Sequence, residues 1–352
     1  MEQDLRELLA LRALPPLKSR EEMKDLLLRE EYGYLPDVAY TVSVREVEAV
    51  CSPLVRGTFP YMKMEMTISS EYGSFVLPFT RLWCEDGRKR PVIVYMDFKH
   101  GVPSGYYPVE LVAEWGVNVI SFFYTDAASD DNDFTNGIAS VLLPHGQEKG
   151  DTCGKLALWS FCASRMLDYA LTLPGADPAR AAVMGHSRLG KTALLTGMLD
   201  ERFTYVFSND AGCCGDAIFR GKGGEQIADI VGAIPFWFCK NFHKYAAVGV
   251  PADFDQHYLL ACIAPRFLHV GAAERDDWAD PLAQQLGCLA AGKAWEELGL
   301  PGFIGGGRRA EVGETIAGGR VAYHLRGGEH QLSYHDWEAY VESLKDRKDG
   351  SL

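Results

Sequence analysis

Short apolar runs, separated by segments with helical periodicity, most strongly constrain how this chain can fold. Pro91–Met96 and Val117–Phe123 are continuous apolar runs, typical of strands that are buried on both faces. Val109–Trp115 between them and Lys155–Leu173 after them have the spacing of helices with an apolar side. We therefore expect an α/β protein, with a mostly parallel central sheet between two helical layers.

The same alternation continues to the carboxyl terminus, and a different pattern precedes it. Further expected strands are Arg180–Met184, Thr204–Ser208, Arg266–Gly271 and Val321–Leu325, and further expected helices are Thr192–Leu199 and Asp336–Lys345. Residues 1–33 have helical spacing, while Val42–Val50, Tyr61–Ser69 and Ser74–Trp83 read as antiparallel strands. Gly305–Gly319 reads as a loop. We expect one domain over residues 1–352, with a helical and antiparallel extension at about residues 1–85.

Charge and composition exclude several classes of partner. The chain has 352 residues, 47% of them hydrophobic, and a formal net charge of −13. A nucleic-acid partner would require clustered lysine and arginine, and no basic run is present. No apolar stretch is long enough to span a membrane, and Met1–Arg12 is too charged for a signal segment. The sequence predicts a cytoplasmic protein, although a secretion signal could have been trimmed.

The nine cysteines have no zinc-site spacing, and an odd number cannot all pair within one chain. We expect reduced, mostly buried thiols. Metal binding or redox sensitivity at Cys213-Cys214 stays open, but the sequence predicts no metal and no cofactor.

Gly185-His186-Ser187-Arg188-Leu189-Gly190-Lys191 places a serine between an expected strand and an expected helix. Serine esterases hold their nucleophile at such a turn, which needs small flanking residues. The second glycine follows the serine by three residues, whereas the general hydrolase motif has two. An ordinary strand-to-helix turn with Ser187 as the helix N-cap is the structural alternative.

A serine nucleophile needs a histidine base and an acid, here in the chain order serine, acid, histidine. The predicted base is His330, in the loop after the last expected strand; His269, His324 and His335 are expected to be structural. Two loops carry candidate acids. One contains Asp210, and the other contains Glu274 and Asp276.

Several motifs resemble those of the glucuronoyl esterases, carbohydrate esterase family 15 of the α/β-hydrolase superfamily. The family has Gly-Cys-Ser-Arg-x-Gly-Lys at its nucleophile, and Asp210-Ala211-Gly212 is similar to its Glu-Ser-Gly. Asp255–Leu260 before Ile263-Ala264-Pro265-Arg266, Trp278 in the following loop, and Tyr32–Pro36 also have counterparts. The resemblance covers nearly the whole chain.

The resemblance implies roles for individual residues. Asp210 takes the place of the family's glutamate but is one methylene shorter; some bacterial relatives use the later loop's acid, so Glu274 and Asp276 stay in contention. The favoured acid is Asp210, with Glu274 next. Arg188 would stabilise the oxyanion, and the implied sugar-binding residues are Lys191, Glu225, Gln226 and Trp278. His186 replaces the cysteine beside the nucleophile, which excludes a disulfide there.

The implied function is a serine esterase acting on carbohydrate esters, foremost 4-O-methyl-glucuronoyl esters, through an acyl-enzyme on Ser187. The alternatives are a sugar acetyl esterase, similar to acetyl xylan esterases, and a non-catalytic carbohydrate-binding protein on the same fold.

Overall fold

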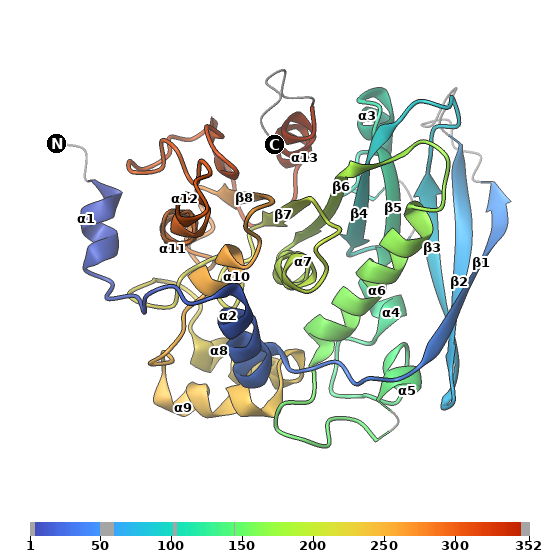
Figure 1. Ribbon diagram of the computed structural model, residues 1–352, viewed down its shortest axis with the longest axis horizontal. Helices are drawn as coiled ribbons and strands as arrows, with labels where there is room; N and C mark the ends of the chain where they lie inside the picture. The colour runs from blue at the N-terminus through green and yellow to red at the C-terminus, as the bar shows by residue number, and fades with distance from the viewer. Residues whose placement is uncertain (1–3, 50–59, 101–103, 144, 346–352) are drawn as a thin grey trace.

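A ten-stranded sheet organises the computed structural model, which describes residues 4–49, 60–100, 104–143 and 145–345 (Figure 1). The strands are β1 (Tyr40–Ala49), β2 (Tyr61–Ser70), β3 (Gly73–Leu82), β4 (Arg90–Asp97), β5 (Asn118–Phe123), β6 (Ala176–His186), β7 (Tyr205–Asn209), β8 (Phe267–Ala273), β9 (Glu314–Ile316) and β10 (Val321–Arg326). Their order in the sheet is β1-β2-β3-β5-β4-β6-β7-β8-β10-β9. The run from β5 to β10 is parallel, whereas β1, β2 and β3 add antiparallel at one edge and β9 at the other. The expected α/β architecture is confirmed.

Helices lie on both faces of the parallel strands, with α3 and α13 on one face and α6 and α7 on the other (Figure 1). The helices are α1 (Leu5–Ala10), α2 (Arg20–Leu27), α3 (Val109–Glu114), α4 (Tyr124–Ala127), α5 (Ala139–Leu142), α6 (Lys155–Ala170), α7 (Arg188–Leu199), α8 (Ile227–Ala233), α9 (Tyr245–Val248), α10 (His257–Ala261), α11 (Pro281–Ala291), α12 (Lys293–Glu297) and α13 (Tyr334–Ser343). Short helical turns add η1 (Leu28–Tyr32), η2 (Pro235–Trp237) and η3 (Lys240–Lys244).

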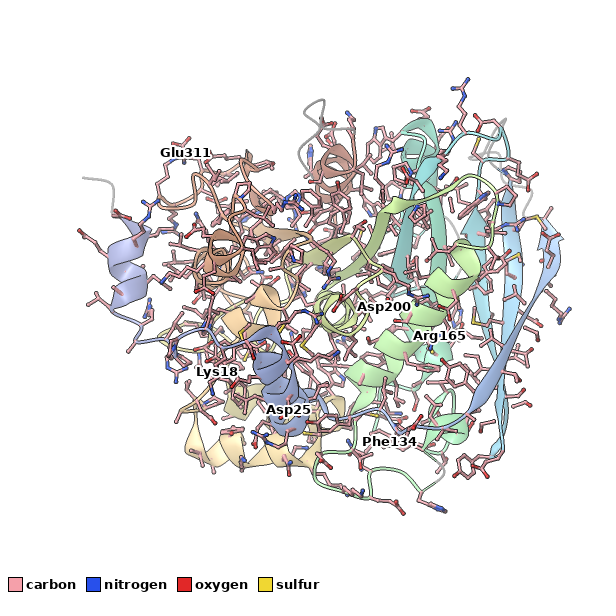
Figure 2. The ribbon with its side chains drawn as sticks, viewed as in Figure 1. Lys18, Asp25, Phe134, Arg165, Asp200 and Glu311 are labelled. Carbon is pink, nitrogen blue, oxygen red and sulfur yellow. The ribbon has the colours of Figure 1, made fainter. Side chains whose placement is uncertain are left out.

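The two helical layers explain the continuous apolar runs of the strands. In β4, Val92 and Val94 pack into the core that contains α6 and α7. Ile93 and Tyr95 pack into a second core, formed with α3 and α13. Successive strand side chains point to opposite faces, so a strand covered on both sides has no solvent-facing position to fill with a polar residue. Side chains fill the space between the layers (Figure 2).

Two expectations near the ends of the chain need correction. Residues 4–33 do not form a continuous helical stretch, because α1 ends at Ala10 and α2 begins only at Arg20, with Pro15 and Pro16 between them. The stretch 305–319 is not all loop, since Glu314–Ile316 forms the short edge strand β9. Val50, the last residue of the first expected strand, lies outside the described residues. No helix in the described ranges has the length and apolar character needed to cross a membrane.

The carboxyl ends of the parallel strands meet at one edge of the sheet. The chain crosses from β4 to β5 through α3 on one face, and then to β6, on the other side of β4, through α6 on the opposite face. Open α/β sheets bind ligands at the carboxyl edge beside such a reversal. Ser187 directly follows β6 at this point.

Candidate active site

Ser187 lies in a strained turn between β6 and α7. Its φ is +56°, a backbone region that non-glycine residues rarely adopt. A Cβ on Gly185 would lie 2.0 Å from the carbonyl oxygen of Leu189, so only glycine fits there. The Ser187 side chain makes no capping hydrogen bond to α7, although the residue occupies the N-cap position. The hydroxyl therefore projects from the turn, as a nucleophile requires.

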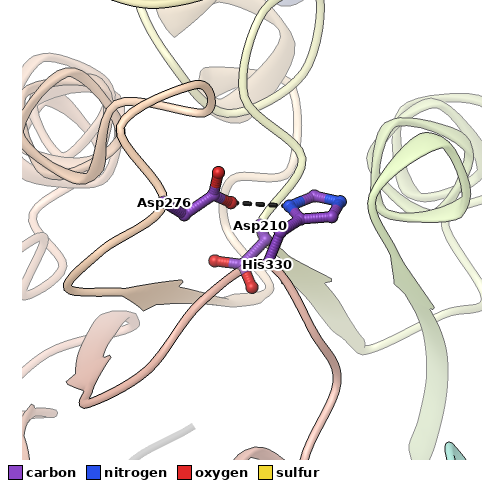
Figure 3. Close-up of side chains that lie close together, drawn as sticks. All are labelled: Asp210, Asp276 and His330. Atoms are coloured by element: carbon purple, nitrogen blue, oxygen red, sulfur yellow. Dashed lines mark hydrogen bonds and ion pairs between the residues drawn. The ribbon is translucent and has the colours of Figure 1, made fainter.

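A histidine and a buried aspartate complete a hydrogen-bonded chain with this serine. His330 Nε2 lies 2.9 Å from Ser187 Oγ, and His330 Nδ1 lies 2.6 Å from Asp276 Oδ2. Figure 3 shows the imidazole directed at the Asp276 carboxylate. Burial would raise the pKa of Asp276, but the hydrogen bond and the charge of His330 outweigh burial and lower that pKa. Asp276 is therefore an ionised acceptor that fixes a proton on Nδ1 and leaves Nε2 to face the serine.

The preference for Asp210 as the partner of His330 is corrected by this geometry. Asp210 Oδ1 accepts a 2.8 Å hydrogen bond from the Ala273 N–H, and its Oδ2 lies 3.0 Å from Arg326 Nη2. Its short side chain is thus held by a strand end and an arginine. Burial and the carboxylates of Asp336 and Asp276 raise the pKa of Asp210, against the effect of Arg326. Such a carboxyl group would stabilise an imidazolium poorly.

Glu274, the second choice, is exposed at the start of the same loop as Asp276. Its backbone N–H donates to the Arg326 carbonyl at 2.8 Å, so it serves to join the two loops. The sequence analysis favoured Asp210, in the other loop, and ranked Glu274 next, whereas the carboxylate that hydrogen-bonds His330 belongs to Asp276.

Arg188 follows the nucleophile and is held by groups that the sequence analysis did not identify. Its guanidinium forms an ion pair with Asp130 and lies 4.9 Å from the Trp237 ring, and Trp237 Nε1 donates to Asp130 at 2.7 Å. The Tyr124 hydroxyl is 3.5 Å from Arg188 Nη1. Tyr124 and Asp130 lie six positions apart, whereas Trp237 comes from a distant segment, 107 positions after Asp130. Together they fix a cation beside Ser187.

Lys191 lies one helical turn after the serine and is only 4% exposed. Its ammonium group donates to the Ala211 carbonyl at 2.5 Å and lies 5.9 Å from the Trp237 ring. An ammonium group carries three N–H donors, so this contact does not use all of its capacity. The Trp237 ring therefore lies beside both the Lys191 ammonium group and the Arg188 guanidinium.

The other expected sugar-binding residues lie on two adjoining loops. The Glu225 N–H donates to the Trp278 carbonyl at 2.9 Å, and Trp278 as a residue is 57% exposed. Gln226 is the N-cap of α8, and its side-chain amide donates to the Gly224 carbonyl at 2.9 Å. Trp278 therefore offers an open ring face, whereas the Gln226 amide group is turned toward its own loop.

His186 is a further residue whose place the sequence did not reveal. Its ring centroid lies 4.6 Å from that of His330, and its Nδ1 is 2.7 Å from Asn209 Oδ1. Burial, followed by the charge of His330, lowers the pKa of His186 to about 3. A neutral imidazole therefore packs against the base. His269 and His324 are buried, 2.9 Å apart through their ring nitrogens, as expected of structural histidines.

The described cysteines are free and buried, with the Sγ atoms of Cys213 and Cys214 3.9 Å apart. Cys51 lies outside the described residues. Asp210, Asp276 and His330 bring possible ligand atoms within 4.8 Å of one another. Arg326 and a backbone N–H already hold the Asp210 carboxylate, so the cluster fits a hydrogen-bonded charge network better than a cation site.

Comparison with known proteins gives a consistent result. The family of fungal glucuronyl esterases matches residues 85–299. Carbohydrate esterase MZ0003, from an unknown prokaryotic organism, is 34% identical over 249 residues, which are 70% of this chain and 57% of the relative. The 4-O-methyl-glucuronoyl methylesterase of Hypocrea jecorina is 31% identical over 212 residues, or 57% of this chain and 45% of the relative. The chain thus matches about half the length of these relatives.

Solved structures extend the similarity to almost the whole chain. A promiscuous family 15 esterase from a marine bacterial metagenome superposes with a TM-score of 0.83 at 27% identity, over 93% of this chain and 90% of that one. The glucuronoyl esterase from Solibacter usitatus superposes with a TM-score of 0.82 at 26% identity, over 93% and 91%. The chain belongs to the glucuronoyl esterases, carbohydrate esterase family 15, and has their α/β-hydrolase fold.

Proposed function

We propose that this protein is a serine carboxylic-ester hydrolase that cleaves glucuronate esters of carbohydrates, foremost 4-O-methyl-glucuronoyl esters. The observation that carries the proposal is the chain of hydrogen bonds from Ser187 through His330 to Asp276, with the fixed cation of Arg188 beside it. A neutral serine is a weak nucleophile, and an oriented imidazole activates it. The names of the relatives support the uronate ester as substrate.

The geometry supports a two-step mechanism. Ser187 Oγ attacks the ester carbonyl carbon while His330 Nε2 takes its proton, and the carbonyl oxygen becomes an oxyanion. Asp276 accepts a hydrogen bond from the Nδ1–H of His330 and so stabilises the imidazolium. The intermediate then expels the alcohol, to which His330 gives the proton. A water molecule, activated by the same imidazole, attacks the acyl-enzyme and releases the acid and free Ser187.

Arg188 supplies the positive charge for the oxyanion in both steps. Its guanidinium is already fixed by Asp130 and Trp237, so it needs no rearrangement as negative charge develops. We assign the uronate ring to the side of the site formed by Lys191, Glu225 and Trp278. There an ammonium group and a carboxylate can hydrogen-bond sugar hydroxyls and an exposed aromatic ring can stack on the sugar.

Comparison of two ester substrates tests the proposal. Benzyl glucuronate should be hydrolysed with a higher kcat/KM than an acetyl ester of similar leaving group, because uronate contacts are expressed in the transition state. A fluorophosphonate probe should label Ser187, and Ser187→Ala should abolish both labelling and turnover. Preference for acetylated sugars would favour the acetyl esterase, and absence of labelling would favour a carbohydrate-binding protein.

The partner that we propose is a carbohydrate ester, not nucleic acid or membrane, in keeping with the net charge of −13. We also propose a cytoplasmic place of action. Cell fractionation tests this localisation. Esterase activity recovered in the culture medium would contradict it.

A further inference from the structure

Arg326, the last residue of β10, holds the loop that carries the catalytic base. The residue is 8% exposed. Its Nη2 donates to the Glu329 carbonyl at 3.0 Å and to the Gln331 carbonyl. These carbonyls belong to the residues immediately before and after His330. One planar guanidinium thus binds the backbone on both sides of the imidazole.

The guanidinium is itself fixed from the opposite side. Its Nε lies 2.8 Å from Asp336 Oδ2, and the Asp336 carboxylate is fully buried. Asp336 also accepts hydrogen bonds from the N–H and hydroxyl of Ser333, at 2.7 Å each, from His324 Nε2 at 2.9 Å and from Asn209 Nδ2 at 3.0 Å. An acceptor with this many donors cannot shift without breaking several bonds. Asp336 therefore anchors Arg326 to strands β7 and β10 and to helix α13.

The same arginine reaches the loop that carries the acid. Its Nη2 lies 3.0 Å from Asp210 Oδ2, and the other oxygen of Asp210 accepts the Ala273 N–H at 2.8 Å, at the end of β8. Two backbone bonds complete the link, from the Glu274 N–H to the Arg326 carbonyl at 2.8 Å and from the Arg275 N–H to the Gly328 carbonyl at 3.0 Å. The base loop and the acid loop are joined through one residue.

We infer that Arg326 is a positioning residue, which sets the distance between His330 and Asp276 without touching the substrate. This inference rests on the proposed function. Asp210, which stands at the position of the family's acid, here forms an ion pair that helps to hold this arginine. The 2.6 Å bond between His330 and Asp276 depends on the relative placement of two loops, and a displacement of about 1 Å can lower turnover by about 10²-fold.

Arg326→Lys is the informative substitution. It keeps a positive charge between Asp210 and Asp336, so the buried carboxylates stay compensated. A lysine ammonium cannot reproduce the planar fork that binds two carboxylates and two carbonyls together. We expect kcat for benzyl glucuronate to fall by roughly 10- to 100-fold with little change in KM. The acidic limb of the pH profile should also change, because a displaced Asp276 no longer holds the base in the same geometry.

Arg266→Lys is the matched control. Arg266 precedes β8 at the opposite end of the sheet and donates to the Phe203 carbonyl at 2.8 Å and the Gly197 carbonyl at 2.6 Å. It clamps backbone as Arg326 does, but far from the strand ends that carry the catalytic groups. The control should lower the melting temperature and leave kcat and the pH profile of the folded enzyme unchanged.

Three outcomes separate the possibilities. The positioning role would be overturned if folded Arg326→Lys had the kcat and pH profile of the wild type. It would also be overturned if the Arg266→Lys control lost as much kcat as Arg326→Lys. If Arg326→Lys does not fold, the same measurements are made on the double variant Arg326→Gln with Asp210→Asn, which removes both charges of the ion pair between these residues. Lack of ester hydrolysis by the wild type, or unimpaired hydrolysis by Ser187→Ala, would overturn the proposed function instead.

Discussion

Asp276 and His330 share a 2.6 Å hydrogen bond although Asp210 lies within 4.8 Å of both. Two carboxyl groups thus flank one imidazole, and their surroundings separate their roles. Asp276 is the group whose pKa is lowered, whereas the pKa of Asp210 is raised by burial and by neighbouring carboxylates. The acid of a triad must be ionised to hold the imidazolium, so the electrostatics agree with the geometry.

Substitution of each carboxyl group by its amide separates the two roles. Asp276→Asn should lower kcat by about 10⁴-fold, because an amide no longer fixes the proton on His330 Nδ1. Asp210→Asn should lower kcat far less but reduce the melting temperature, since Arg326 loses a buried partner. Steady-state kinetics and thermal unfolding of both variants provide the check. A larger loss of kcat in Asp210→Asn would restore Asp210 as the acid.

Removal of the Arg188 guanidinium should act on the transition state. Arg188→Met should lower kcat by roughly 10²- to 10³-fold and change KM much less, as expected when one oxyanion donor is lost. Arg202→Met is the control, because Arg202 also pairs with aspartates but lies on the surface near Asp168 and Asp200. Equal kinetics of Arg188→Met and wild type would contradict the oxyanion role.

Lys191 should discriminate between substrates. Lys191→Met should lower kcat/KM for a glucuronate ester by about 10- to 100-fold, the effect of losing a charged hydrogen bond to a sugar hydroxyl. An acetyl ester without sugar hydroxyls should be affected much less. The exposed Lys240→Met should leave both substrates unchanged. Parallel losses on the two substrates would show that Lys191 acts through its bond to the Ala211 carbonyl instead.

Glu31 should make the folded protein less stable as pH rises. Burial raises the pKa of this fully buried carboxyl from 4.5 to about 8, with opposing hydrogen bonds from Gln256 and Tyr32. Between these values the folded state keeps a proton that the unfolded chain has released, so the free energy of unfolding falls from about pH 4.5 to about pH 8. Glu31→Gln should flatten this slope and raise the melting temperature at pH 8.

Glu30→Gln is the neighbouring control for that measurement. The pKa of Glu30 is lowered, chiefly by Lys244 against a burial effect, so both states are ionised across the window and the slope should stay as in the wild type. Identical pH slopes for wild type and Glu31→Gln would show that Glu31 is already ionised at neutral pH.

The parts of this site that follow from local sequence were predictable, and the parts set by distant contacts were not. Ser187 stands between glycines at a strand end and His330 follows the last strand, so position in the chain predicted both, and their side chains lie 2.9 Å apart. The Asp210 carboxylate is instead bound by Arg326, which is 116 positions away in the chain. Nothing near Asp210 in the sequence shows that an arginine will bind it.

The same distinction applies to the fold. Buried strands such as β4 were evident because both of their faces are apolar. The edge strand β9 has three residues in a segment rich in glycine and charge, so periodicity had too little length to detect it. Pro15-Pro16 lies between α1 and α2, and the apolar spacing on either side of it does not show this break.

The contiguity of the base loop has a consequence for protein engineering. Arg326, the carbonyls on either side of His330, and Asp336 all belong to a single stretch of chain. A residue inserted between Arg326 and Asp336 would alter the spacing of every member, whereas a change of length at an exposed turn such as Glu71-Tyr72 leaves it untouched. Residues 326–336 therefore form one cassette, whose exchange between homologous scaffolds should keep its length and also its outside partners Asp210 and Asn209.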